Sequence, residues 1–253
     1  MNPVTGVIIA KNEAKKIRQV VENLSFCGEV LVVDNKSTDQ TVVVATKSGA
    51  KVVSQGGQNF AEIRNAGLKE AQHPWVLFVD ADETIPVELK NEIIQIVNNP
   101  EIKKSGYQIH RRNYFLGHQM KYGEIGCDWV VRMAKKDAGA WERGVHEVWA
   151  VKGEVGKLKN SLVHQTATNL TDFLDKTIEF AQRHAQANLA EGKRASFWKV
   201  FLYPKAKFIK AYIFKAGWRD GVHGLVYAMI MTWHSFLAWG DAWALQKKQS
   251  TKP

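Results

Sequence analysis

The first hundred residues alternate between short apolar runs and longer segments with helical spacing. We expect β-strands in the apolar runs, at residues 4–10, 29–33, 50–54 and 75–79. We expect helices where apolar residues recur every three or four positions, over residues 17–24, 39–48, 60–71 and 86–98. Asn59 is available as the N-cap of the third helix, and Pro86 is expected at the first position of the fourth. This alternation predicts an α/β fold, a parallel sheet with helices on both faces.

Acidic residues stand where two of these strands end. Asp34 closes the second strand, and Asp80 and Asp82 follow the fourth. In open α/β sheets, ligands bind beyond the carboxyl ends of the strands. Two carboxylates at positions i and i+2 of a turn can approach one Mg²⁺ or Mn²⁺ ion, because both cations prefer oxygen ligands.

Each of these acidic residues also has a structural interpretation. Asp82 would cap a later helix from a solvated turn, because Asp is a preferred residue for caps and turns. Asp34 would form an Asx-turn that leads into a helix capped by Thr38 or Asp39. The two interpretations of Asp34 are compatible, since a turn and a ligand site can share residues.

Residues 105–164 have a different character, because aromatic and basic residues mix with glycines there. We expect short strands at residues 106–112, 128–134 and 145–151, joined by long loops of the kind that carry specificity. Residues 170–190 have helical spacing again. We therefore expect one domain over residues 1–190 and a separate helical region over residues 191–253.

The basic charge of the chain is concentrated in its last quarter. The 253 residues carry a formal net charge of +10, and residues 193–253 hold 11 basic and two acidic residues. Eight basic residues and several aromatic ones lie between positions 193 and 219, where no acidic residue occurs. Residues 221–240 then contain no Asp, Glu, Lys or Arg. This length is near the ~20 residues that span a bilayer, but its His, Ser and Gly residues favour a buried or interfacial helix.

The overall composition narrows the class of protein. A 45% share of hydrophobic residues with 24% charged residues excludes a globally disordered chain. Cys27 and Cys127 have no metal-ligand spacing, and we expect free thiols in a reducing compartment. Residues 1–6 lack a basic segment before an apolar run, so we expect no secretory signal.

Four motifs, taken in order, resemble the family 2 glycosyltransferases. They are Val-Ile-Ile-Ala-Lys-Asn-Glu at 7–13, Val-Val-Asp-Asn-Lys-Ser-Thr-Asp-Gln-Thr at 32–41, Ala61-x-x-Arg64-Asn65-x-Gly67, and Phe-Val-Asp-Ala-Asp-Glu at 78–83. Later segments are similar to a bacterial subgroup that includes the lipopolysaccharide inner-core glucosyltransferases. These segments are Asp-Trp-Val-Val-Arg-Met at 128–133, Gly-Val-His-Glu at 144–147, and residues 212–224.

The resemblance implies a GT-A fold, which is a Rossmann-like mixed sheet flanked by helices, here with a helical C-terminal appendage. It also implies inversion at the anomeric carbon and a nucleotide-sugar donor, usually a UDP-sugar. It implies that residues 1–100 form the donor-binding half and residues 101–190 the acceptor half. The implied donor-site residues are Ala10, Asn12, Glu13, Asp34, Arg64, Asp80, Ala81 and Arg132. Asp34 would hold the uracil or ribose, and Arg64 would donate to the diphosphate or the donor sugar. Asp82 and Asp80 would bind the divalent cation, Mg²⁺ or Mn²⁺.

An inverting transfer also needs a carboxylate that takes the proton of the acceptor hydroxyl. The resemblance favours Glu147, with Asp128 and Glu142 as alternatives. His146 and His164 are candidate metal ligands, although a lone histidine more often has a structural role. Arg132 is a candidate for the diphosphate or the acceptor, and a surface ion pair is its alternative.

Residues 191–253 are expected to dock on an anionic membrane surface, where Lys and Arg contact lipid phosphates and Trp lies at the interface. The docking candidates are Lys199, Lys205, Lys207, Lys210, Lys215, Arg219, Trp198 and Trp218. One alternative is plain packing, with Phe197, Phe201, Phe208 and Tyr212 forming a helix face against the domain. We expect no nucleic-acid partner, because the uncharged stretch suits lipid and not phosphate.

The sequence therefore predicts a cytoplasmic enzyme, peripheral at the inner face of the cytoplasmic membrane. It would transfer glucose or another hexose from a UDP-sugar to a lipopolysaccharide-core or other lipid-linked glycan. One alternative is a family 2 transferase that acts on an undecaprenyl-linked sugar or a peptide. The other is a non-catalytic lipid- or nucleic-acid-binding protein with a degenerate transferase body.

Overall fold

The computed structural model describes residues 1–57, 59–143 and 147–250, and the chain divides into two compact units. Unit 1 comprises Met1–Arg111 and Trp129–His164, and unit 2 comprises Arg112–Asp128 and Gln165–Pro253. The domain boundary that we predict at residue 190 stays a prediction, because compactness does not test which residues serve catalysis.

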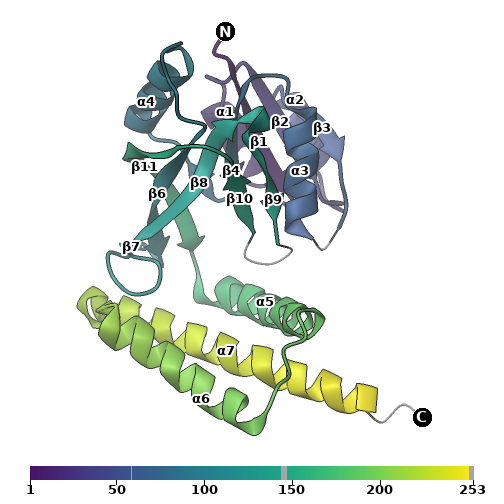
Figure 1. The fold of residues 1–253 in the computed structure, drawn as a ribbon, viewed down its shortest axis with the longest axis vertical. Coiled ribbons are helices and arrows are strands. Elements are labelled where there is room, and N and C mark those ends of the chain that lie inside the picture. The colour runs from purple at the N-terminus through teal and green to yellow at the C-terminus, as the bar shows by residue number, and fades with distance from the viewer. Residues whose placement is uncertain (58, 144–146, 251–253) are drawn as a thin grey trace. The chain divides into compact units, whose positions relative to one another are not determined.

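The main sheet has the strand order β3-β2-β1-β4-β8-β6-β11-β5 (Figure 1). Its strands are β1 (Val4–Ala10), β2 (Glu29–Asp34), β3 (Lys51–Ser54), β4 (Trp75–Asp80), β5 (Glu83–Thr84), β6 (Gly106–Phe115), β8 (Asp128–Lys135) and β11 (Val155–Ala167). The strands from β3 to β4 are parallel, as predicted, whereas β8 runs antiparallel to β4 and β5 antiparallel to β11. The sheet is therefore mixed.

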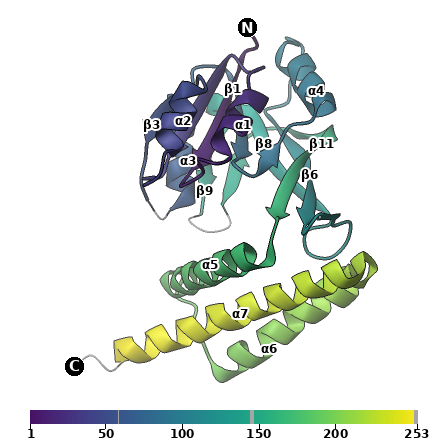
Figure 2. The ribbon, with the colours of Figure 1, turned by 180° about the vertical axis from the view of Figure 1, so that it is seen from behind.

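Helices cover both faces of the sheet in unit 1. They are α1 (Ile17–Asn23), α2 (Thr41–Lys47), α3 (Phe60–Glu70) and α4 (Val87–Val97), with the short 3₁₀-helix η1 (Lys136–Ala138). Figure 1 shows α3 with the antiparallel hairpin β9 (Gly139–Glu142) and β10 (Val148–Val151) nearest the viewer, and Figure 2 shows α1 and α2 from the other side. The two faces correspond to the two apolar clusters of unit 1.

The alternation of side chains along each strand explains why the strands read as continuous apolar runs. Val7 and Phe78 face α3 and the hairpin, whereas Ile8 and Val79 face α1 and α4. Burial on both faces requires an apolar residue at every position. Gly67 brings α3 close to the sheet, because a Cβ there would lie only 2.7 Å from Val7 Cγ1.

Of the predicted first residues and caps of the helices, some are confirmed and others are wrong. The side chain of Asn59 accepts hydrogen bonds from Ala61 N and Glu62 N, which confirms it as the N-cap of α3. The position predicted for Pro86 is wrong: its backbone is extended and it is the N-cap of α4, so the helix begins one residue later. Helix α2 begins at Thr41 and not at residue 39, because Asp39 accepts a hydrogen bond from Thr41 N before the helix starts.

Among its described residues, unit 2 contains three α-helices, one π-helix and one 3₁₀-helix. Its elements are β7 (His118–Gln119), which pairs with the end of β6, α5 (Leu170–Ala190), α6 (Phe197–Phe208), the π-helix η2 (Ile209–Phe214), the 3₁₀-helix η3 (Gly217–Asp220) and α7 (Gly221–Ser250). Helix α7 packs against both α5 and α6 (Figures 1 and 2). The predicted helix over residues 170–190 is confirmed, and the uncharged stretch lies within α7.

The start of α7 is tied to the loop after β7. The buried carboxylate of Asp220 accepts hydrogen bonds from Tyr122 N (2.9 Å) and Lys121 N (3.1 Å). A core of Phe115, Met120, Ala167, Tyr227 and Ile230 lies beside this junction. Among the helices of the described residues, none combines the length and apolarity needed to cross a membrane.

Candidate active site

Strand register brings the predicted acidic residues to one edge of the sheet. Ala10 pairs with Asp34 on β2, and its neighbour Ile9 pairs with Asp80 on β4. Asp34 and Asp80 therefore flank the end of β1, about 10 Å apart across two strand spacings. This edge is where an open α/β sheet binds ligands.

The loops after β1 and β2 are joined by hydrogen bonds. Asn12 N donates to Ser37 Oγ (2.9 Å), and Asn12 Oδ1 accepts from Thr38 N (2.8 Å). The backbone of Asn12 is left-handed, with φ +58°, a conformation that Asn tolerates better than most residues. The carboxylate of Asp34 accepts from Ser37 N (3.2 Å), three residues further on, whereas an Asx-turn bonds the backbone two residues on. The predicted cap by Thr38 or Asp39 is wrong, because the N-cap of α2 is Gln40.

Glu13 belongs to the same pair of loops. Its backbone N donates to Thr41 Oγ1 (2.8 Å), and its carboxylate lies 3.6 Å from Lys16 Nζ. These bonds fix the two loops beside the buried Ala10. The structure thus gathers the predicted nucleoside-side residues Ala10, Asn12, Glu13 and Asp34 at the ends of two adjacent strands.

Arg64 connects the end of β4 to the residue that precedes β10. Its Nη2 donates to Asp80 Oδ1 (2.9 Å), and its Nε donates to Glu147 Oε1 (3.2 Å). The guanidinium is buried and lies 4.7 Å from the ring centroid of Trp141, a cation–π contact. Its position follows from the close approach of α3 to the sheet at Gly67, one turn further along the helix. Among the described residues, Arg64 Nη1 has no hydrogen-bond partner.

Arg132 reaches the same carboxylate from β8. Its Nη2 donates to Asp80 Oδ2 and to Glu83 Oε1 (2.9 Å). Glu83 is buried, accepts from Asp80 N (2.9 Å) and lies 3.4 Å from Arg111 Nη1. The alternative of a surface ion pair is wrong for Arg132, because its side chain is only 5% exposed.

Glu83 and Arg111 were not predicted as site residues. The signal for Glu83 was its place beside Asp82 in the fourth motif, but the sequence does not show that its carboxylate turns inward. For Arg111, the chain gives no local signal, since it is one of several basic residues in residues 105–115. Both become visible only when β6 and β8 are placed in the sheet.

The cluster balances its charges internally. Three guanidinium groups (Arg64, Arg111 and Arg132) face three carboxylates (Asp80, Glu83 and Glu147). Burial would raise the pKa of Asp80, but the charges of Arg132, Arg64 and Arg111 hold the pKa of that carboxyl well below its usual range. Burial would lower the pKa of Arg132, and the carboxylates of Asp80 and Glu83 raise it instead.

Asp82 lies next to Glu83 in the sequence and is close to a histidine of β11. Its Oδ1 lies 3.5 Å from His164 Nε2, because β5 pairs with β11 and sets Glu83 opposite His164. In the part of the chain that the structure describes, no three His, Cys, Asp or Glu side chains are grouped to hold a metal. An oxygen and an imidazole nitrogen that converge nevertheless fit a cation that takes its other ligands from a substrate diphosphate.

A comparison with known sequences decides the family. The sequence profile of glycosyl transferase family 2 matches residues 5–146, more than half of the chain. This protein belongs to glycosyl transferase family 2. The resemblance drawn from the four motifs is thereby confirmed, and the chain is a glycosyltransferase.

Relatives of this glycosyltransferase match nearly all of its length. It is 24% identical over 243 residues to the lipopolysaccharide core biosynthesis glycosyltransferase LpsC of Rhizobium meliloti, covering 93% of this chain and 90% of LpsC. It is 25% identical over 251 residues to an uncharacterized glycosyltransferase of Rickettsia bellii, covering 92% and 84% of the two chains.

The crystal structure of S. aureus TarS 1–349 in complex with UDP-GlcNAc shares the fold, with a TM-score of 0.50 and 14% identity. The alignment covers 97% of this chain and 92% of the TarS chain. The predicted GT-A fold is confirmed.

Other predicted residues of the transferase are placed as follows. Ala81 is buried beside Asp80, and His146 lies outside the described residues. Of the alternative bases, Glu142 is exposed on β9, and Asp128 belongs to unit 2, where Asn113 Nδ2 lies 3.5 Å from its carboxylate. Glu147 accepts a hydrogen bond from Arg64 Nε and is the candidate base that this guanidinium holds in place.

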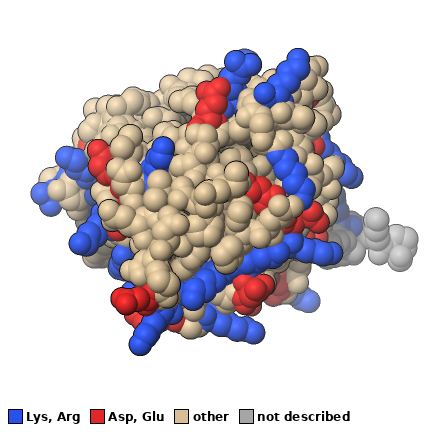
Figure 3. All heavy atoms as spheres, turned by 90° about the horizontal axis from the view of Figure 1, so that it is seen from above, with Lys and Arg blue, Asp and Glu red and all other residues tan. Residues whose placement is uncertain are grey.

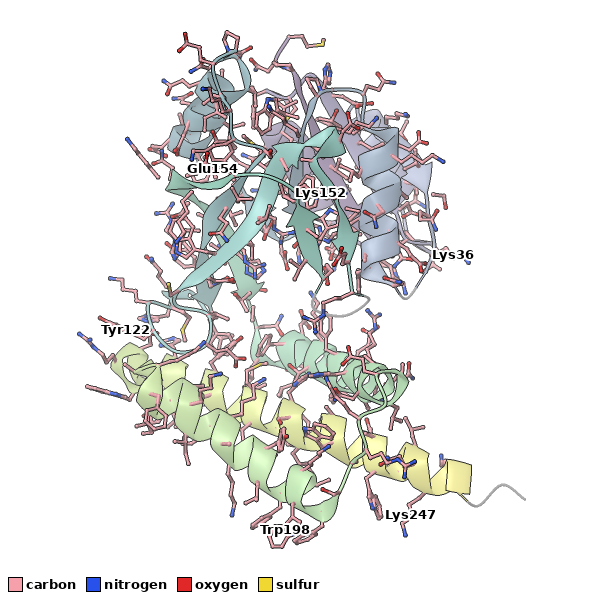
Figure 4. The ribbon with its side chains drawn as sticks, viewed as in Figure 1. Lys36, Tyr122, Lys152, Glu154, Trp198 and Lys247 are labelled. Carbon is pink, nitrogen blue, oxygen red and sulfur yellow. The ribbon has the colours of Figure 1, made fainter. Side chains whose placement is uncertain are left out.

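The docking candidates of the transferase all lie in unit 2. Lys199 and Lys205 lie over the rings of Trp239 (5.0 Å) and Phe201 (3.7 Å), and Arg219 lies over Tyr122 (4.3 Å). Lys207 is half-buried and lies 3.5 Å from Glu124, whereas Lys210, Lys215 and Trp218 are exposed. Figure 4 shows Trp198 projecting outward from α6, with its side chain 64% exposed. Of the residues in the packing alternative, Phe197 and Phe201 are exposed on α6.

Proposed function

We propose that this glycosyltransferase moves a hexose from a UDP-sugar to a lipid-linked glycan with inversion at the anomeric carbon. The observation that carries the proposal is the pair of hydrogen bonds that Arg64 donates to Asp80 and Glu147 at the carboxyl edge of the sheet. One guanidinium thus holds the Glu147 carboxylate close to the Asp80 carboxylate at the end of β4.

The donor would occupy the loops that follow β1, β2 and β4. Asn12, Glu13 and Asp34 supply polar groups for a base and a ribose, and their loops are already tied together in the structure. Arg64 and Arg132 would stand near the diphosphate and the sugar. The TarS crystal structure holds UDP-GlcNAc, and a nucleotide sugar is the class of donor that we propose here too.

A divalent cation fits the charge of the site. Three arginines are already matched by three carboxylates, so the cluster has no cationic excess for a diphosphate. Asp82, with His164 at 3.5 Å, would hold Mg²⁺ or Mn²⁺. When bound, such an ion stabilises negative charge on the departing nucleoside diphosphate.

Glu147 would serve as the general base. The acceptor hydroxyl oxygen forms its bond to the anomeric carbon while its proton passes to the Glu147 carboxylate. The bond from the anomeric carbon to the diphosphate oxygen breaks, and the electron pair leaves with the nucleoside diphosphate. Attack on the face opposite the leaving group inverts the configuration. Arg64 orients Glu147 for this step and is a positioning residue for it.

The acceptor would be a lipopolysaccharide-core or similar glycan on a lipid. The name of LpsC and the basic composition of residues 193–253 both support this choice. Exposed cations on α6, η2 and η3, with Trp198 and Trp218, would hold the protein at the inner face of the cytoplasmic membrane.

A donor screen by thermal shift tests the catalytic part. Unfolding temperatures are measured with a panel of nucleotides and nucleotide sugars, with and without Mn²⁺. We expect UDP-sugars to stabilise the protein only when Mn²⁺ is present, and we expect Asp82→Ala to abolish that response together with transfer. A protein that responds to no nucleotide would favour the non-catalytic alternative. An Asp82→Ala variant with unchanged transfer would contradict the role of Asp82 in holding the cation.

Vesicle flotation tests the acceptor side separately. We expect more protein to float with phosphatidylglycerol vesicles than with phosphatidylcholine vesicles at low salt, because lipid phosphates attract the basic residues. Equal recovery with both lipids would contradict electrostatic docking and leave the donor result unaffected.

A further inference from the structure

Helix α7 presents a continuous apolar stripe to solvent. Large exposed apolar side chains recur along it every third or fourth residue at Val222, Leu225, Met229, Trp233 and Phe236, and another follows two turns later at Trp243. The exposed fractions run from 39% at Leu225 to 73% at Val222. At a rise of 1.5 Å per residue, the stripe is about 30 Å long.

This stripe lies on the side of α7 that faces away from α5. Tyr227 and His234 mark the α5 side, since their rings lie 5.9 Å and 5.6 Å from those of Phe173 and His184. Met229 follows Tyr227 by two residues, and Phe236 follows His234 by two, a rotation of about 200° in each case. The helix therefore buries one side in the bundle and leaves the opposite side apolar and exposed.

An exposed apolar stripe of this length marks a contact surface, because soluble proteins rarely leave such areas open without a function. Residues 221–240 contain no Asp, Glu, Lys or Arg, whereas the solvent-exposed face of a helix usually carries such charged residues. Exposed cations border the stripe at both ends. Arg219 precedes it, and Lys247 lies 5.8 Å from the ring of Trp243 at its far end.

The surrounding charge favours a bilayer over a second copy of the chain. Residues 193–219 contain eight basic and no acidic residues, so a symmetric pairing of this region would bring like charges together. Anionic lipid offers the complementary charge at the headgroups and an apolar phase just below them. Trp233 and Trp243 suit that boundary, where one end of the side chain is apolar and the other meets water.

We propose that α7 lies in the plane of an anionic bilayer surface, with this stripe inserted among the acyl chains and the cations of α6 and η3 at the headgroups. Attachment then has two components. The basic residues supply a salt-sensitive attraction, and the stripe supplies a salt-resistant one. The second component is additional to the electrostatic docking proposed above and requires neither donor nor acceptor.

Flotation of the full chain at two salt concentrations separates the components. With phosphatidylethanolamine–phosphatidylglycerol vesicles, raising salt from 0.1 M to 1 M shortens the screening length from about 10 Å to about 3 Å. We expect wild-type protein to stay partly bound at 1 M salt. The double variant Met229→Glu/Phe236→Glu is expected to lower the fraction of protein bound at 1 M salt by about tenfold or more. Losing even one of the two apolar side chains from the bilayer has an effect of about that size.

Phe180→Glu is the matched control, because Phe180 is an equally exposed aromatic residue on α5. It should float like wild type at both salt concentrations, and circular dichroism should show intact helices in both variants. Wild-type protein that detaches completely at 1 M salt, or a stripe variant that floats like wild type, overturns the proposal. A stripe variant that only converts a dimer to a monomer, measured by light scattering, would identify a second copy as the occupant and also overturn it.

Discussion

Arg64 donates its Nε–H to Oε1 of Glu147 over 3.2 Å, although the two residues are 83 positions apart in the chain. The same guanidinium donates to Asp80 Oδ1, so one buried side chain connects the end of β4 to the candidate base. The cation–π contact with Trp141 of β9 fixes the guanidinium plane against the hairpin. A base held by this bond has a defined position before any substrate binds, which is the kind of preorganisation that a general base requires.

Replacing the candidate base should remove turnover and spare donor binding. We expect Glu147→Gln to lower kcat by about 10²–10⁴-fold, the usual contribution of a positioned base. The amide oxygen can still accept from Arg64, so the Kd for UDP should be unchanged. Single-turnover kinetics and calorimetric UDP titration measure the two quantities. Glu142→Gln, on the exposed edge of the same hairpin, is the control and should keep wild-type kcat.

Glu83 should matter for stability far more than an exposed acidic residue with a similar partner. Its buried carboxylate meets Arg132, Arg111 and Asp80 N, and neutralising it leaves buried guanidinium charge without balance. We expect Glu83→Gln to lower the free energy of unfolding by about 3–5 kcal/mol. Glu154, labelled in Figure 4, forms an exposed ion pair with Lys104, and Glu154→Gln should cost about 0–1 kcal/mol. Urea denaturation of both variants gives the comparison, and equal losses would show that Glu83 holds no buried charge network.

The depressed pKa of Asp80 predicts a pH-dependent contribution to stability. Folding keeps this carboxyl ionised below its ordinary pKa of about 3.9, so its contribution is complete above that value and is lost as pH falls toward the folded pKa. Asp80→Asn lacks the titrating group. The difference in unfolding free energy between wild type and Asp80→Asn should therefore shrink as pH is lowered from about 5 to about 3. A difference that stays constant over that range would contradict the ion pairs of Asp80 with Arg64 and Arg132.

The two cysteines should differ in reactivity. Burial raises the pKa of Cys27 to about 12, so almost none of it is thiolate at pH 8, whereas Cys127 is exposed. We expect native protein to react with one equivalent of a thiol reagent and denatured protein with two. The Cys127→Ser variant should show no fast reaction when native. Rapid modification of Cys27 in that variant would place its side chain outside the core of unit 1.

The elements that the sequence predicts are those with a dense local signal. Strands β1, β2 and β4 are buried on both faces, so each appears in the sequence as a continuous apolar run. Strand β11 was not predicted, although it is 13 residues long. Its inward positions include Leu158 and Leu162, but polar residues such as Lys157, Lys159 and His164 lie around them. Such alternation gives a weaker signal than a continuous apolar run.

The sequence by itself determined the family, the acidic residues at the strand ends and the concentration of basic charge after residue 192, because each is a local or additive property of the chain. Only the tertiary structure decided what Glu83, Arg111 and Arg132 do, since their charges meet across β5, β6 and β8. It also divided the uncharged stretch into a buried and an exposed side, which depends on where α5 and α6 pack. Charge pairing and burial are properties of distances between side chains, and those distances arise only when strands and helices far apart in sequence pack together.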